Sequence, residues 1–442
     1  MLNIAEQLDA ILPTALSGRV TQTVGTTVSA VGFPAPVGAI AEIKRDRGQL
    51  LRAQVIGFRD SSTILYPLGN SSGVRRGNRV RLARTSRWLR VGNELLGRVL
   101  DAEGNAVDGT PAPALRNRAP FDRRPPHPCR RPPIDAPLAT GIRAIDGLLT
   151  CGRGQRMGIF AASGVGKSVL LGMMARFSSA EVIVIGLIGE RGREVGEFLR
   201  RDLGPEGLTR SVVVVATSDE PAMLRVNAAA TATAIAEYFR DQGKDVLLLV
   251  DSLTRVALAQ REIGLAAGEP PTTRGYPPSV FAALPKLVER AGQAELGSIT
   301  AFYNVLVEAD DPNEPISDAV RGLLDGHVWL SRTLASRGHY PAIDVLESLS
   351  RVMPTVTNEE HRQAAAMVRE LLATQRDHED MISVGAYQPG TNLTVDRAVQ
   401  MQEAIHDYLT QTADKPSEPN EARDKLLALR ARAEQPQDQE TE

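Results

Sequence analysis

The segment Ala161-Ala162-Ser163-Gly164-Val165-Gly166-Lys167-Ser168 lies between two stretches with different hydrophobic patterns. Residues 156–160 (RMGIF) form a short apolar run typical of a buried strand, and residues 169–176 (VLLGMMAR) have a helical pattern. A glycine-rich turn between a strand and a helix lets backbone N–H groups surround phosphate groups at the positive N-terminus of that helix. The segment therefore predicts a phosphate-binding loop within an α/β domain.

Each part of this loop has an expected role in holding ATP. Lys167 reaches the terminal phosphates, and the Ser168 hydroxyl ligates Mg²⁺. The remaining nucleotide contacts come from the small residues of the turn and the first helical turn, namely Ser163, Gly164, Val165, Gly166 and Val169. Ala161 stands where the strict pattern has its first glycine, and the alternative interpretation is a glycine-rich turn without a ligand.

Two carboxylates follow strand-like runs further along the chain. Residues 246–250 (VLLLV) end at Asp251, and residues 182–188 (VIVIGLI) lead to Glu190. Parallel strands place their carboxyl ends at one edge of a sheet, so both side chains should lie near the phosphate loop. Asp251 is predicted to hold Mg²⁺ and Glu190 to orient or deprotonate the attacking water. Taken alone, Glu190 could equally form an ordinary loop salt bridge.

The hydrophobic pattern divides the chain into several parts. Apolar runs alternate with helical stretches across residues 141–352, which indicates a mostly parallel sheet covered by helices. Short β-branched runs with Gly, Pro and Asn-Ser turns across 18–100 predict a small antiparallel barrel. Residues 353–412 form a helical domain. The remaining predictions are an amphipathic helix over 1–17, a Pro- and Arg-rich linker over 101–140, and a disordered tail over 413–442 with a short helix near 423–433.

Bulk composition excludes some functions but names none. The formal net charge is −2, from 51 basic and 53 acidic residues, which argues against a dedicated nucleic-acid or anionic-membrane surface. Cys129 and Cys151 have no metal-ligand spacing. The first residues do not have the pattern of a secretory signal, and no apolar run has the length of a membrane span. We expect a cytoplasmic protein that meets a membrane only peripherally, through partners.

Further motifs carry a resemblance to a known family. They are GERGRE at 189–194, GEPP at 268–271, RGYPPSVF at 274–281, PAID at 341–344 and SLSR at 348–351. With these motifs, the chain resembles the ATPases of type III protein export, the flagellar and virulence relatives of the catalytic β subunit of rotary ATP synthases. The likeness extends over residues 18–409 and implies a RecA-like fold for the P-loop ATPase domain.

The resemblance assigns roles that spacing alone does not give. It implies that Arg191 is a phosphate-side neighbour of Glu190, that Tyr340 packs on adenine, and that Arg351 is the arginine finger of a neighbouring subunit's site. Arg351 by itself would more often be a structural salt-bridge residue. Because Glu190 and Arg351 occur in one chain, identical copies can complete every site in a closed ring, which the resemblance makes a homohexamer.

The resemblance also implies partners, and it is compatible with both the flagellar and the virulence branch of the family. The partners are a stator or negative regulator at the N-terminal helix, a central stalk protein, the export gate, and chaperone–substrate complexes that the ATPase would separate and unfold. Ala162 does not distinguish the flagellar from the virulence branch, whereas LLGMMAR at 170–176 and ITAFY at 299–303 favour the flagellar one.

Three alternative functions remain at this stage. A Rho-like RNA translocase shares the ATPase core, but its barrel needs aromatic stacking platforms, and residues 18–100 offer only Phe33, Phe58, Tyr66 and Trp88. The second is a subunit of a proton- or sodium-driven ATP synthase, and the third is a scaffold that binds nucleotide without hydrolysing it. The linker arginines also allow an RNA-binding arm, although interleaved aromatics are lacking.

Overall fold

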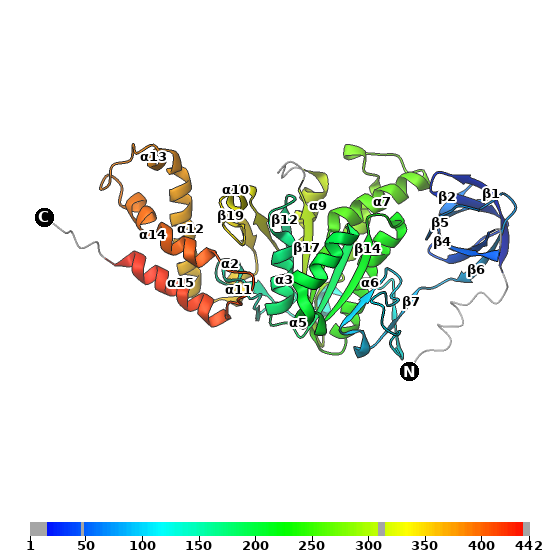
Figure 1. Cartoon of the computed structure of the whole chain (residues 1–442), viewed down its shortest axis with the longest axis horizontal. Coiled ribbons are helices and arrows are strands. Elements are labelled where there is room, and N and C mark those ends of the chain that lie inside the picture. Colours follow the sequence, from blue (N-terminus) through cyan, green and yellow to red (C-terminus); the bar gives the residue numbers. More distant parts are fainter. Residues whose placement is uncertain (1–15, 46–47, 308–313, 436–442) are drawn as a thin grey trace.

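The computed structural model describes residues 16–45, 48–307 and 314–435 of the 442-residue chain. Three parts follow one another along the long axis of the molecule (Figure 1). A β-barrel lies at one end, a sheet covered by helices lies in the middle, and a group of helices forms the other end. This confirms the predicted fold class. The helix predicted over residues 1–17 falls almost entirely outside the described residues.

The N-terminal part is a closed six-stranded antiparallel barrel with the strand order β1-β2-β5-β4-β3-β6. Its core is made of Ala, Val, Ile, Leu and Phe side chains, and along β4 buried residues alternate with more exposed ones. The strands are β1 (Ser17–Val24), β2 (Thr27–Val31), β3 (Ile40–Lys44), β4 (Leu50–Arg59), β5 (Ser62–Pro67) and β6 (Arg79–Arg84). The barrel therefore ends at Arg84, earlier than the predicted boundary at residue 100.

The chain after the barrel packs on the central domain instead of forming a free connector. Strand β7 (Trp88–Val91) pairs with β9 (Asn117–Pro120), and β8 (Arg98–Leu100) is an edge strand of the central sheet. Within the predicted linker, Ala102 and Phe121 are buried, and the Arg87 guanidinium lies 3.4 Å from the Phe121 ring centroid. Prolines predict extended backbone, but they do not prevent the apolar residues between them from joining a core. Two short elements complete this stretch, η2 (Asn93–Leu95) and η3 (Pro128–Arg130).

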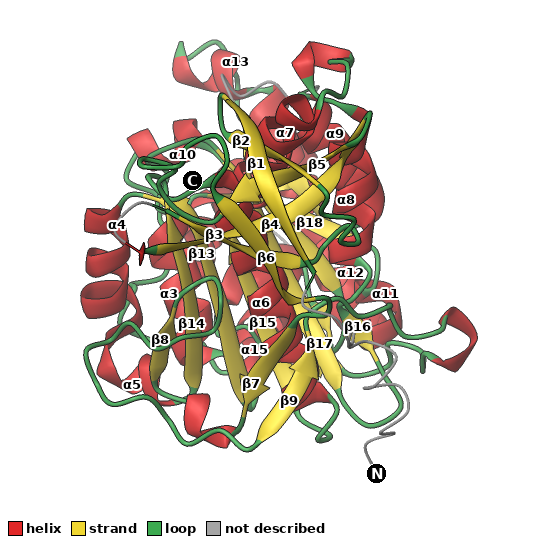
Figure 2. Ribbon diagram, turned by 90° about the vertical axis from the view of Figure 1, so that its right-hand side faces the viewer, coloured by secondary structure: helices red, strands yellow, loops and turns green. Residues whose placement is uncertain are grey.

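The central domain is built on a nine-stranded, mostly parallel sheet, whose strands run side by side in Figure 2. The main order is β19-β18-β12-β17-β15-β13-β14-β8, with β16 paired to β17. Only β19 and β16 run antiparallel to their neighbours. The strands are β12 (Arg156–Ala161), β13 (Val182–Glu190), β14 (Ser211–Thr217), β15 (Asp245–Asp251), β16 (Gly292–Gln293), β17 (Ser298–Leu306), β18 (Gly326–Leu330) and β19 (Ile343–Ser350). A separate short pair joins β10 (Pro137–Leu138) to β11 (Cys151–Gly152).

Helices cover both faces of this sheet, which explains why its strands are almost continuously apolar. Side chains of α3 pack in one core cluster, and side chains of α6, α7 and α8 pack in another. The helices are α2 (Arg143–Leu148), α3 (Lys167–Phe177), α4 (Gly192–Glu197), the π-helix η4 (Phe198–Leu203), α5 (Gly204–Thr209), α6 (Ala222–Arg240), α7 (Leu253–Ala267), η5 (Thr273–Gly275), α8 (Pro278–Val288), α9 (Pro315–Leu323) and α10 (Arg332–Ser336).

The C-terminal part is helical, and it continues through most of the segment predicted to be a disordered tail. Its helices are α11 (Met353–Val356), α12 (Glu359–Asp377), α13 (Glu379–Ser383), α14 (Leu393–Leu409) and α15 (Pro419–Glu434). Along α15, Ala422, Leu426, Leu429 and Ala433 are buried at helical spacing. This apolar stripe outweighs the polar composition: the short helix predicted near residues 423–433 is part of a longer helix, and the prediction of disorder is wrong for residues 419–422 and 434. Among the described residues, no helix is both long and apolar enough to cross a membrane.

Candidate active site

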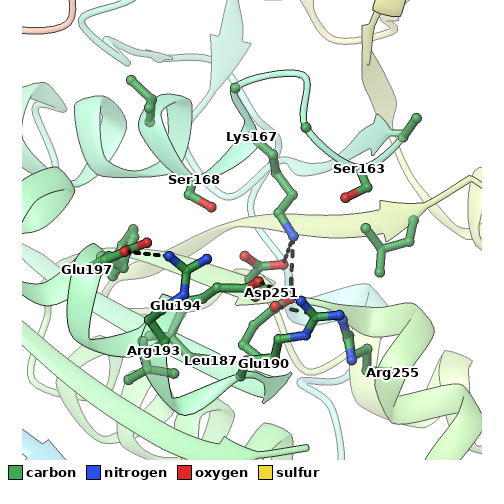
Figure 3. A pocket seen from close by; sticks show the side chains of 18 residues that line it. Ser163, Lys167, Ser168, Leu187, Glu190, Arg193, Glu194, Glu197, Asp251 and Arg255 are labelled. Atoms are coloured by element: carbon green, nitrogen blue, oxygen red, sulfur yellow. Dashed lines mark hydrogen bonds and ion pairs between the residues drawn. The ribbon is translucent and has the colours of Figure 1, made fainter.

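Three strands of the central sheet end around one cavity. Strands β12, β15 and β13 belong to the parallel part of the sheet and finish at Ala161, Asp251 and Glu190. Their carboxyl ends therefore lie at the same edge. A cavity of about 500 Å³ opens there between the loop after β12 and the start of α4 (Figure 3). Its lining includes Ser163, Gly164, Gly166, Lys167, Ser168, Val169, Glu190, Arg191 and Asp251.

The loop between β12 and α3 has the backbone of a phosphate cradle. Gly164 and Gly166 have φ angles of 84° and 87°, a region that residues with a side chain rarely adopt. Helix α3 begins directly afterwards at Lys167, so its unpaired N–H groups and positive dipole end face the cavity. Val165, within the loop, is buried. The alanines at 161 and 162 lie outside the two positions whose positive φ angles favour glycine.

Lys167 bridges the two predicted acidic residues. Its Nζ lies 2.8 Å from Asp251 Oδ1 and 3.4 Å from Glu190 Oε1. Dashed lines mark these two contacts in Figure 3. The three side chains are only 13%, 4% and 11% exposed. A shared cation between two carboxylates compensates their charge in this low-dielectric edge. Phosphate groups entering the cavity would compete with both carboxylates for Lys167.

Burial and neighbouring charges act in opposite directions on the pKa values of Glu190 and Lys167. Burial raises the pKa of Glu190, while the Lys167 ammonium acts to lower it. Burial alone would lower the pKa of Lys167, but the carboxylates of Asp251 and Glu190 outweigh it and raise that pKa. A hydrogen bond with Glu194 further raises the pKa of Glu190 and lowers that of Glu194. Glu190 thus has the environment of a carboxyl that can exchange a proton with water.

The residues predicted to hold Mg²⁺ are suited to that ion. The Ser168 hydroxyl and the Asp251 carboxylate line the same cavity, and both are hard oxygen donors. In nucleotide sites Mg²⁺ takes one or two protein oxygens and completes its shell with phosphate oxygens and water. The Asn304 amide donates to Asp251 Oδ1 at 2.6 Å and fixes the carboxylate at the cavity edge.

The three residues named by resemblance lie in different surroundings. Arg191 lines the cavity, but its side chain is 76% exposed and its nearest carboxylate oxygen is Glu194 Oε1, at 3.8 Å. Tyr340 lies beside the phosphate loop, since a Cβ placed on Gly166 would come within 3.3 Å of its ring. Arg351 is exposed and does not line the cavity.

Sequence reasoning missed some of the side chains in and around this cavity. Arg255, in the first turn of α7, points its guanidinium toward Glu190 Oε2 at 3.8 Å. A Cβ on Gly189 would lie 2.7 Å from Arg255 Cδ, so this glycine gives the arginine its place beside Glu190. Glu194 and Asn304 were also missed. A polar Asn304 near the end of the apolar strand β17 was a readable signal, whereas the direction of Arg255 required the structure.

Family models match the three parts of the fold. The β-barrel domain of the ATP synthase alpha/beta family matches residues 20–83, and its nucleotide-binding domain matches residues 141–350. The T3SS EscN ATPase C-terminal domain matches residues 357–428. The last match includes part of α15.

Relatives of both export systems are similar to the chain over most of its length. A flagellum-specific ATP synthase of Bacillus subtilis is 50% identical, over 90% of this chain and 92% of that protein. A type 3 secretion system ATPase of Xanthomonas euvesicatoria is 52% identical, over 90% of each. The assembled ATPase EscN from the enteropathogenic E. coli type III secretion system is 46% identical, with a TM-score of 0.88 over 93% of this chain and 99% of EscN.

Proposed function

The chain is an ATPase of the ATP synthase alpha/beta family, in the group of flagellar and type III secretion ATPases, and we propose that it energises protein export as a homohexameric ring. The observation that carries the ring is the position of Arg351. The assembled state of the related EscN supports the same proposal.

Arg351 lies at the end of the sheet opposite to the phosphate loop. Ala161, before the loop, pairs with Leu330 at the carboxyl end of β18. Strand β19 is antiparallel to β18, so Ser350 pairs with Gly326 at the amino end. Those two levels are about 13 Å apart along the strands. Arg351 therefore cannot reach the phosphate loop of its own chain, and a finger role requires a neighbouring copy.

Each site residue has a proposed part in hydrolysis. Lys167 moves from Asp251 and Glu190 to the terminal phosphates, and the loop N–H groups hold the phosphate oxygens. Glu190 then orients the attacking water and accepts a proton from it. Mg²⁺ bound with ATP neutralises the phosphate charge, and Ser168 and Asp251 would hold it. Tyr340 is proposed to pack on adenine, and Arg191 to contact the phosphate side of the cavity.

The partners belong to this proposal as well. EscN has been described in complex with its central stalk EscO, which supports a stalk protein in the centre of a ring of this chain. We further propose release of chaperones and unfolding of export substrates at an export gate, with a stator or regulator at the N-terminus, on the cytoplasmic face of the membrane. Flagellar export is the proposed system, based on the residues at 170–176 and 299–303. Deleting the gene for this chain should then abolish motility and leave secretion through a needle unaffected.

An RNA translocase is less well supported by the barrel. Phe33 and Tyr66 are buried in or below it, which leaves Phe58 and Trp88 as the exposed aromatics of those four. Two separated aromatic side chains are a poor stacking platform for successive bases.

A mixing experiment tests whether sites are completed between chains. Arg351→Ala should abolish turnover and Glu190→Gln should lower it by about 10²- to 10⁴-fold, while nucleotide binding is largely kept in both. Mixed at equal amounts, an Arg351→Ala chain contributes Glu190 and a Glu190→Gln neighbour contributes Arg351, so about a quarter of the interfaces of a random ring become competent. The double variant mixed with Glu190→Gln restores none and serves as the control. Full activity of Arg351→Ala alone, or no recovery in the mixture, would refute the shared site.

A further inference from the structure

We infer that Asn304 is a positioning residue for the ATPase reaction, holding the Asp251 carboxylate in place when Lys167 transfers to the phosphates. This inference rests on the proposed role of Asp251 at the Mg²⁺ side of the site. It concerns a residue that does not line the cavity, so it would act through Asp251 and without touching the nucleotide.

Asn304 has a central place in the sheet. Strand β17 lies between β12, which leads into the phosphate loop, and β15, which ends at Asp251. In register, Asn304 pairs with Ile159 of β12, and the preceding Tyr303 pairs with Val250 of β15. The Asn304 side chain is fully buried within an otherwise largely apolar strand. Burying an amide there costs free energy unless the amide forms hydrogen bonds.

The amide is oriented by the carboxylate that it contacts. Asn304 Nδ2 donates to Asp251 Oδ1 at 2.6 Å, and the reverse orientation would bring two oxygens together. Asn304 Oδ1 is buried without a protein hydrogen-bond partner among the described residues. A buried acceptor without a partner costs free energy, whereas the amide donor of Asn304 is satisfied by Asp251. The hydrogen bond to Asp251 is therefore the reason for an asparagine at this position.

Two donors share one oxygen of Asp251. Lys167 Nζ and Asn304 Nδ2 both contact Oδ1, at 2.8 Å and 2.6 Å. Phosphate groups attract Lys167 away, because an ammonium and a terminal phosphate attract each other strongly. Asn304 lies below the cavity on a rigid strand and cannot follow. It therefore remains as the donor that keeps Asp251 Oδ1 satisfied and the other carboxylate oxygen turned to the cavity.

The test uses Asn304→Leu, which keeps the branched shape and removes the donor. The readout is affinity for a fluorescent ADP analogue, measured across Mg²⁺ concentrations and in EDTA. Loss of a residue that orients a metal ligand costs about 10- to 100-fold in metal affinity or activity. Mg²⁺ should increase the affinity for the nucleotide, and in the variant half of this increase should require at least about tenfold more Mg²⁺ than in the unmodified protein. The affinity measured in EDTA should stay unchanged within about twofold.

Matched variants distinguish positioning from a general loss of structure. Asn227 is also buried and accepts a hydrogen bond from Arg87, and its amide nitrogen has no partner within the part of the chain that the structure describes. Asn227→Leu therefore controls for burying leucine in place of asparagine. It should leave the Mg²⁺ requirement unchanged. If Asn304→Leu does not fold, Asn304→Ala, which removes the amide donor and adds neither bulk nor charge, replaces it with the same expectation.

Two outcomes separate this inference from the proposal beneath it. If Asp251→Ala raises the Mg²⁺ requirement and neither Asn304 variant does, the positioning role is overturned while the Asp251 assignment stands. If Asp251→Ala also leaves the Mg²⁺ requirement unchanged, the proposed metal-side role of Asp251 fails, and the role of Asn304 fails with it.

Discussion

Lys167→Ala should weaken the folded protein as well as stop hydrolysis. In the nucleotide-free site, the Lys167 ammonium is the cation that lies between Asp251 and Glu190, at 2.8 Å and 3.4 Å. Removing it leaves two nearly buried carboxylates facing each other without that partner. The loss of activity follows from the lost phosphate contact, and the loss of stability follows from uncompensated charge.

The size of the stability loss can be worked from burial. Breaking a buried ion pair from one side costs about 3–5 kcal/mol, and the slight exposure of Lys167 places the expected value at the lower end, about 3 kcal/mol. For a domain of this size, each kcal/mol lowers the melting temperature by about 2–4 °C, so a fall of about 6–12 °C is expected. In the variant one carboxyl will have a raised folded pKa, so the loss shrinks as the pH falls and grows as the pH rises.

The assay is thermal unfolding of nucleotide-free protein, with a second variant that removes one of the charges. Glu190→Gln in the Lys167→Ala background should restore most of the melting temperature without restoring turnover. Lys244→Ala is the matched control, because Lys244 pairs with Glu181 at the surface with both side chains nearly half exposed, where a pair contributes about 0–1 kcal/mol. A Lys167→Ala protein that melts like the Lys244→Ala control, or no recovery in the double variant, would refute the reasoning.

Three further predictions concern single side chains. Glu190→Gln should lower turnover by about 10²- to 10⁴-fold without lowering the melting temperature, because burial raises the pKa of Glu190 and the folded protein already disfavours its charge; steady-state rates and unfolding on one preparation check both parts. Leu426→Ala, at a fully buried position of α15, should cost about 3 kcal/mol in denaturant unfolding, and the half-buried Leu427 should cost clearly less. Burial and the neighbouring His406 lower the pKa of His339, so its contribution to stability is complete above the unfolded value and lost as pH falls below it. His339→Gln should therefore reduce the drop in melting temperature between about pH 7.5 and pH 5.5.

Much of the active site could be predicted from sequence because of one geometric rule. Parallel strands share an edge, so the runs that end at Ala161, Glu190 and Asp251 place these residues at the same edge of the sheet once the strands are parallel. Local residue choice was also informative, because glycine at 164 and 166 matches the positive φ angles of the loop. Neither inference needed knowledge of which strands are neighbours.

The parts that could not be predicted depend on register and on tertiary burial. The contact between Asn304 and Asp251 requires β17 to lie beside β15, which sequence order does not reveal. Arg255 reaches Glu190 because α7 begins at Leu253, directly after the strand. Composition misled in the linker and at the start of α15, because a few apolar residues such as Phe121 and Ala422 decide burial within segments that are polar on average.

The positions of the three charged residues proposed to act in hydrolysis connect catalysis to assembly. Glu190 and Lys167 lie at the carboxyl edge of the sheet, whereas Arg351 lies at the amino end, held there by its backbone N–H donating to Asp325 O at 3.0 Å. No side-chain rotation spans the about 13 Å between those levels. A single copy of the chain can therefore bind ATP with a nearly complete site yet lack the finger. If Arg351 acts as proposed, rapid hydrolysis can begin only where copies meet, which would confine ATP use to the assembled ring.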